Sequence, residues 1–104
     1  MDLWTELKKL EGFTFQTLKQ KKKFEVIVVT DSLILIKPQA RGKERSISRK
    51  EVEGSYHELV ASRQISRSQI EDRYSPRNSA FVAALLAQLA GVDFTDDPIT
   101  LYYR

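Results

Sequence analysis

The stretch that decides the fold is residues 24–37, which read FEVIVVT, then DS, then LILIK. Both apolar runs are rich in β-branched residues, which favour strands. Asp31 and Ser32 are turn residues, and Pro38 ends the second run because proline cannot donate to a sheet ladder. Each run is apolar on both faces for part of its length. The pattern therefore predicts two strands at the centre of a sheet, with one face under helices and the other partly covered.

Shorter segments extend this hairpin in both directions. Residues 13–18 alternate like a strand and lead into a polar turn at 19–22, whereas residues 44–47 form a short fourth strand after a basic loop at 39–43. Upstream, Asp2 can cap a helix that Gly12 closes. The sequence thus predicts a short helix over 1–12 and a strand meander over 13–48.

A hexapeptide that occurs twice predicts two helices. It reads ISRKEV at residues 47–52 and ISRSQI at 65–70. In each copy a serine, Ser48 or Ser66, can accept from the amide three residues on, while the flanking apolar residues pack together as a staple. We expect helices from residue 49 to about 61 and from 67 to about 74.

A third helix is expected over residues 80–90, after a break at Ser75-Pro76. Its large apolar residues are separated almost entirely by alanine, so it has no strong polar face and belongs in a core or against a partner chain. An acidic tail, residues 93–104, follows and ends in a possible edge strand at 99–103. The whole chain, 1–104, is therefore predicted to be one α+β domain: an antiparallel sheet of three or four strands, with a short N-terminal helix and three C-terminal helices packed on one face.

Composition narrows the classes of function. The 104 residues include no cysteine, which excludes disulfides and thiolate metal sites and fits a cytoplasmic protein. His57 is the only histidine, so a His-pair metal site is excluded. No apolar run approaches the ~20 residues of a membrane span. We predict no metal, no cofactor, no membrane contact and no catalytic residue.

Positive charge gathers in the meander. Between Lys19 and Lys50 lie ten basic and three acidic residues, a net charge of +7 in a chain whose total is +3. A clustered field of one sign indicates a polyanionic partner, most often nucleic acid. We therefore predict a non-catalytic nucleic-acid-binding or accessory module that grips phosphates. The predicted contacts are Lys21, Lys22, Lys23, Arg41, Lys43, Arg45, Arg49, Lys50 and Arg67.

Other interpretations of the same residues stay open. Lysines also protect sheet edges from aggregation. Residues 63–78 carry polar and basic side chains between two helices and loosely resemble a helix-turn-helix. Phe13, Phe15 and Phe24 are expected in the core, although exposed aromatics could stack on bases. The alternative function is a protein-interaction module or homodimer that uses the third helix or the last strand.

Three stretches, RNSAFVAALL at 77–86, Ile47-Ser48-Arg49, and Trp4 with Leu7, are similar to those of small uncharacterised prokaryotic domains. The resemblance covers about residues 1–92, and it implies a strand meander with capped helices. Some such domains accompany DNA-processing or restriction-type proteins, so the resemblance also implies association with nucleic acid. It carries over no catalytic residue, and Ala80 stands where the family pattern has a serine.

Overall fold

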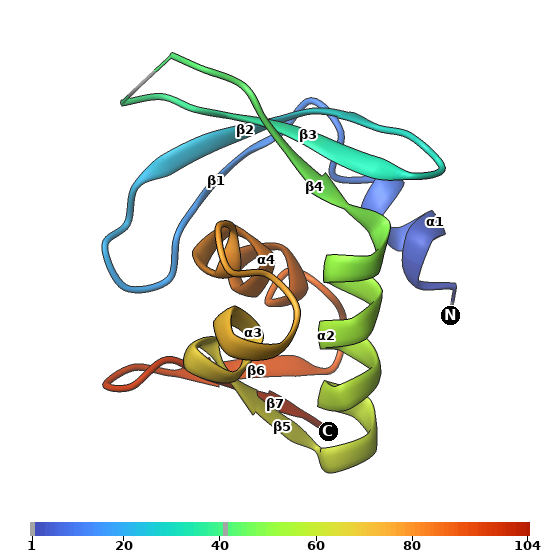
Figure 1. Ribbon diagram of the computed structural model, residues 1–104, viewed down its shortest axis with the longest axis vertical. Helices are drawn as coiled ribbons and strands as arrows, with labels where there is room; N and C mark the ends of the chain where they lie inside the picture. Colours follow the sequence, from blue (N-terminus) through green and yellow to red (C-terminus); the bar gives the residue numbers. More distant parts are fainter. Residues whose placement is uncertain (1, 41) are drawn as a thin grey trace.

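Two antiparallel sheets lie on either side of a helical layer (Figure 1). The computed structural model describes residues 2–40 and 42–104. Helix α4 (Ser79–Leu86) lies between the sheets, and α2 (Arg49–Ser62) runs along one side from the first sheet to the second. The predicted α+β architecture, an antiparallel sheet with one short N-terminal and three later helices, is confirmed.

The first sheet contains four strands in sequence order. They are β1 (Thr14–Gln16), β2 (Lys23–Val29), β3 (Leu33–Pro38) and β4 (Arg45–Ser48). A bulge between Val26 and Val28 shifts the register of β2 against β3. Because side chains alternate across a strand, one face of this sheet buries Phe24, Val26, Ile34, Ile36 and Ile47 against the helices. The short helix α1 (Leu3–Lys8) joins the sheet through Trp4, whose Nε1 donates to the Thr30 carbonyl over 2.6 Å.

Both predicted capping boxes are present. Ser48 and Glu51 exchange bonds at the start of α2, and Ser66 and Gln69 do so at the start of α3 (Arg67–Arg73). The side-chain oxygen accepts from the third amide over 3.3 Å in α2 and 3.1 Å in α3. Each helix therefore begins at the residue that its serine predicts.

Glu51 also ties the start of α2 to the loop before α4. Its Oε2 accepts from the Ser48 amide over 2.7 Å, while its Oε1 accepts from the Ser75 hydroxyl over 2.6 Å and from Asn78 Nδ2 over 3.5 Å. Burial raises the pKa of Glu51, but these hydrogen bonds outweigh it and hold the pKa below its usual value. The ionised carboxylate thus fixes the loop that carries Arg77.

Helix α4 is the central element of the core. Val82, Ala83, Ala84, Leu85 and Leu86 are all buried, as the lack of a polar face predicts. The helix is shorter than predicted because the amides of Gln88 and Leu89 bond three residues back and tighten the turn beyond Leu86.

A second sheet was not predicted. Its strands are β5 (Gln64–Ser66), β6 (Val92–Thr95) and β7 (Thr100–Tyr103), in the order β5-β7-β6. The last strand exists as predicted, but its placement at an edge is wrong, since β7 pairs with a strand on each side. The segment between α2 and α3 is strand β5 and not the turn of a helix-turn-helix. Helix α4 and β7, on which the interaction-module alternative depended, are both internal.

None of the helices in the described residues combines the length and the apolar character that crossing a bilayer requires. The described residues also contain no group of three His, Asp or Glu side chains placed to hold a metal ion.

Candidate nucleic-acid interface

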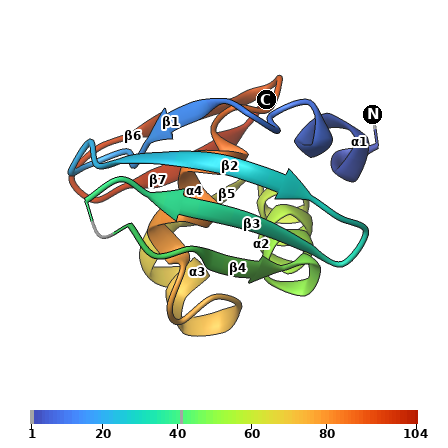
Figure 2. The same cartoon turned by 90° about the horizontal axis from the view of Figure 1, so that it is seen from above.

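The polar turn at residues 19–22 with the adjoining Lys23, which we call the lysine turn, lies at the same end of the first sheet as the described residues of the basic loop, 39–40 and 42–43 (Figure 2). In an antiparallel meander the connections alternate between the two ends, so the β1–β2 turn and the β3–β4 loop share one end. The register confirms this, because Gln16 lies opposite Lys23 and Phe24 lies opposite Pro38. Lys43 is exposed in the loop, and Arg41 lies outside the described residues.

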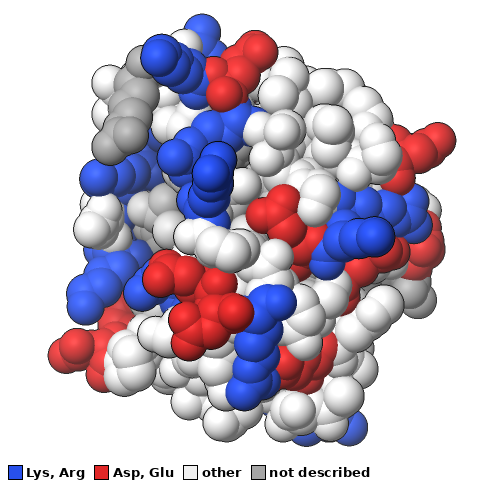
Figure 3. All heavy atoms as spheres, in the orientation of Figure 1, with Lys and Arg blue, Asp and Glu red and all other residues white. Residues whose placement is uncertain are grey.

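Lys and Arg side chains cluster at this end of the sheet in the space-filling view (Figure 3). They occupy the upper left of the molecule, with acidic side chains at the margin of the cluster. Over the rest of this face the two signs are mixed. The positive charge that is clustered in the sequence is therefore also clustered on one part of the folded surface.

Thr17 holds the lysine turn in shape. Its amide donates to the Lys22 carbonyl over 3.0 Å, its carbonyl accepts from the Lys21 amide over 3.1 Å, and its hydroxyl accepts from the Lys22 amide over 3.0 Å. Thr17 is itself buried, so the turn is anchored to the body of the protein. The backbone of Lys21 adopts a left-handed conformation with φ of 57°.

Because Lys21 adopts this conformation, it lowers the free energy of unfolding of the protein. A non-glycine residue pays about 1–2 kcal/mol in the left-handed region, whereas glycine pays only a smaller entropic cost. We expect Lys21→Gly to raise the free energy of unfolding by about 0.5–1 kcal/mol in urea denaturation followed by circular dichroism. Lys22→Gly is the matched control, because Lys22 has an ordinary φ, and it should lower stability by a similar amount. Equal shifts of the same sign would contradict this explanation.

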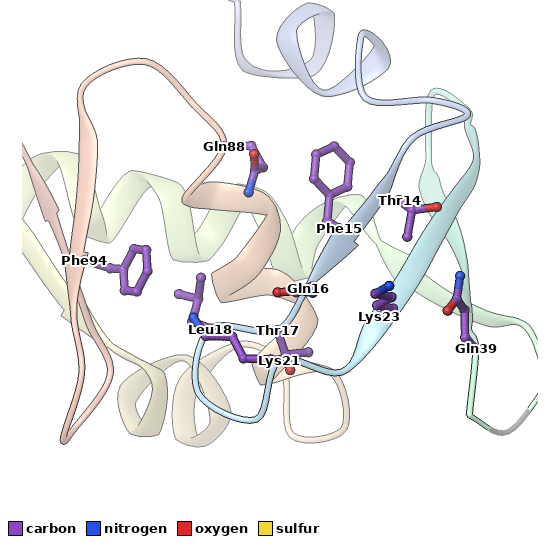
Figure 4. A pocket seen from close by; sticks show the side chains of 10 residues that line it. All are labelled: Thr14, Phe15, Gln16, Thr17, Leu18, Lys21, Lys23, Gln39, Gln88 and Phe94. Carbon is purple, nitrogen blue, oxygen red and sulfur yellow. The ribbon is translucent and has the colours of Figure 1, made fainter.

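Three neighbouring hollows bring the cations of this end together. An open groove of about 710 Å³ between β1 and β6 is lined in part by Lys21 and Lys23 (Figure 4). A cleft of about 220 Å³ is lined by Lys22, Lys23 and Arg45, and one of about 240 Å³ by Arg45 and Arg77. Since Lys23 lines the first two hollows and Arg45 lines the last two, the three hollows are neighbours. We call this row the basic track: Lys21, Lys22, Lys23, Arg45 and Arg77.

Among the described residues, no carboxylate lines the hollows of the basic track or pairs with its cations. None of the described residues that line its three hollows is Asp or Glu. Within the described part of the chain, no track residue has a carboxylate in salt-bridge contact. A fourth hollow, at the opposite end of the sheet, is different because Asp31 and Glu53 line it beside Arg49 and Lys50. Unneutralised cations therefore adjoin one another on the track.

Arg45 is held in place at the middle of the track. Its guanidinium lies 5.6 Å from the centroid of the Phe81 ring. Its Nη1 donates to the Arg77 carbonyl over 3.2 Å and lies 3.4 Å from Asn78 Oδ1. These contacts occupy one nitrogen and leave the other guanidinium donors available for an anion.

Arg49, Lys50 and Arg67 do not line the three hollows of the track. Arg49 pairs with Glu53 over 3.0 Å and stacks 4.8 Å from the Trp4 ring centroid, and Lys50 adjoins it. Arg67 pairs with Glu71 over 2.9 Å. The two arginines thus have structural partners, and one amide at the start of each helix bonds its capping serine.

The aromatic side chains expected in the core divide into three environments. Phe24 is fully buried, Phe15 is half-buried, and Phe13 is 61 % exposed, which corrects the expectation for Phe13. Sequence reasoning missed Phe94, which is 39 % exposed on β6 and lines the groove. It also left Arg77 out of the predicted contacts, although the residue stands in the basic segment 63–78.

Comparison of the chain with protein-family models, with curated proteins and with solved structures gave no match. The resemblance to small prokaryotic domains therefore stays a prediction. The functional argument rests on the charge and geometry of the basic track.

Proposed function

We propose that this protein is a non-catalytic nucleic-acid-binding module that grips the phosphate backbone with the basic track. The single observation that carries the proposal is that three neighbouring hollows share the cations Lys23 and Arg45, with no carboxylate among their described lining residues. Edge protection alone requires scattered lysines. It does not require an arginine from the start of β4 and one from the loop before α4 to join the same surface.

The chemistry of the track suits phosphate better than base edges. Lysine ammonium groups act as flexible point charges, and guanidinium groups form directed bonds to phosphate oxygens. Such contacts position a nucleic acid but carry little sequence information. We therefore expect binding that depends weakly on sequence and strongly on salt.

Salt dependence of binding tests this proposal. A labelled random-sequence duplex should bind at 50 mM salt in a fluorescence anisotropy titration. If all five track cations neutralise phosphates, the logarithm of affinity should fall with the logarithm of salt with a slope of about −4 to −5. Affinity should then drop by about 10²- to 10³-fold between 50 and 200 mM. A flat salt response, or no binding at 50 mM, would reject phosphate gripping.

A further inference from the structure

The groove lies between the free edges of the two sheets. β1 is the outer strand of the first sheet, and β6 is an outer strand of the second. The groove that they border has a volume of about 710 Å³, which falls in the range of sites that bind small organic groups. It is open to solvent, and Lys21 and Lys23 of the basic track are among the residues that line it.

Two aromatic rings lie on opposite sides of this groove. Figure 4 shows Phe94 on the β6 side and Phe15 on the β1 side. Phe15 is anchored, because its ring packs 6.2 Å from the buried Phe24 ring. Phe94 is 39 % exposed, and Lys21 Nζ lies 5.9 Å from its ring centroid. Lys21, a proposed phosphate contact, thus lies over a partly exposed ring on which the attached base could stack.

Side-chain amides complete the lining. Gln16, Gln39 and Gln88 reach the groove from β1, from the β3–β4 loop and from the segment after α4. A side-chain amide has both hydrogen-bond donors and an acceptor, so it can form hydrogen bonds with the edge of any base. Within the described residues, neither Gln16 nor Gln39 uses its side chain in a hydrogen bond.

From these features we infer that the preferred ligand is a single-stranded nucleic acid, with a base stacked on Phe94 in the groove and its phosphates on the basic track. This inference rests on the proposed function for the phosphate contacts of Lys21 and Lys23. To the proposed function it adds a preference for single-stranded over double-stranded nucleic acid. In a duplex the bases are paired and stacked on one another, so a duplex can reach the track only through its backbone. A splayed single strand can also fill the groove.

Three probes of equal length and label separate the contributions: a single-stranded oligothymidylate, a duplex that contains the same strand, and an abasic single strand that has phosphates without bases. We expect the wild-type protein to bind the oligothymidylate more tightly than either of the others at equal salt. Phe94→Ala should weaken oligothymidylate binding by about 5- to 150-fold, since stacking on one aromatic side chain is worth about 1–3 kcal/mol. The loss on the other two probes should be at least fivefold smaller. Phe94→Tyr should restore stacking.

Phe13→Ala is the matched control, because Phe13 is also an exposed phenylalanine but does not line the groove. It should leave the order of the three affinities unchanged. Equal losses on all three probes for Phe94→Ala, or no loss on the oligothymidylate, would overturn the inference. The proposed function would survive that result provided that duplex binding keeps its steep salt response. Absence of binding to every probe at 50 mM salt would overturn both.

Discussion

Replacing Phe24 with alanine is expected to lower the free energy of unfolding by about 3–5 kcal/mol. The side chain is fully buried, and its ring meets the Phe81 ring edge-on at 5.1 Å and the Phe15 ring at 6.2 Å. Its removal leaves a cavity bordered by two aromatic side chains. The free energy of unfolding of a small domain is about 5–15 kcal/mol in total, so this loss should be measurable by urea denaturation at 25 °C.

Phe24→Leu is the control for this prediction. Leucine keeps most of the apolar volume but loses the aromatic contacts, so it should cost less than half as much as alanine. A loss below about 1 kcal/mol for Phe24→Ala would contradict the packing described for this residue.

Phe24 also connects the core to the candidate site. Phe81 packs on Phe24 from one side and supports the Arg45 guanidinium, while Phe15 packs on Phe24 and faces the groove. The middle of the basic track and one wall of the groove therefore rest on the same buried ring. A core substitution at this position should disturb binding as well as stability.

Local sequence chemistry explains which elements were predictable. The strands β2 and β3 follow from runs of β-branched residues around a two-residue turn, and both later helices begin at capping boxes. The second sheet carries no such signal. β5 has three residues, and three of the four residues of β6 are exposed. Its pairing of Ile65 with Leu101 is set by tertiary packing, which residue patterns do not reveal.

The candidate site was predictable in the same uneven way. Antiparallel geometry brings the β1–β2 turn and the β3–β4 loop to one end of the first sheet. Once the meander is recognised, the sequence therefore predicts that Lys21, Lys22, Lys23 and Arg45 lie close together. The sequence also indicates that Arg49 has an acidic partner outside the basic track, because Glu53 stands four residues further along the same helix. The net charge of the segment does not reveal this pairing. Arg67 and Glu71 repeat that spacing. Phe94 gave no signal, since its place in the groove depends on the second sheet.

The triple substitution of Lys21, Lys22 and Lys23 by glutamine should weaken duplex binding by about 10- to 100-fold at 100 mM salt. Each lysine that no longer neutralises a phosphate removes about one unit from the salt slope, so the slope should become shallower by about 2–3. All three side chains are exposed and form no ion pair among the described residues. Stability should therefore change by less than about 0.5 kcal/mol. Anisotropy titrations at four salt concentrations measure both quantities.

The control variant replaces Lys8, Lys9 and Lys50 by glutamine. It removes the same three charges, but Lys8 pairs with Asp31 and Lys50 lines the hollow beside that residue, so these cations adjoin the opposite end of the sheet. Long-range attraction by net charge alone would make the two triple variants equally weak, because both bring the net charge from +3 to zero. Contact with phosphates on the basic track predicts instead that the control keeps its affinity within about threefold and its full salt slope. Equal losses of affinity in the two variants would therefore refute localised binding. A loss confined to the variant of Lys21, Lys22 and Lys23 would place the nucleic acid at the end of the sheet that carries the lysine turn.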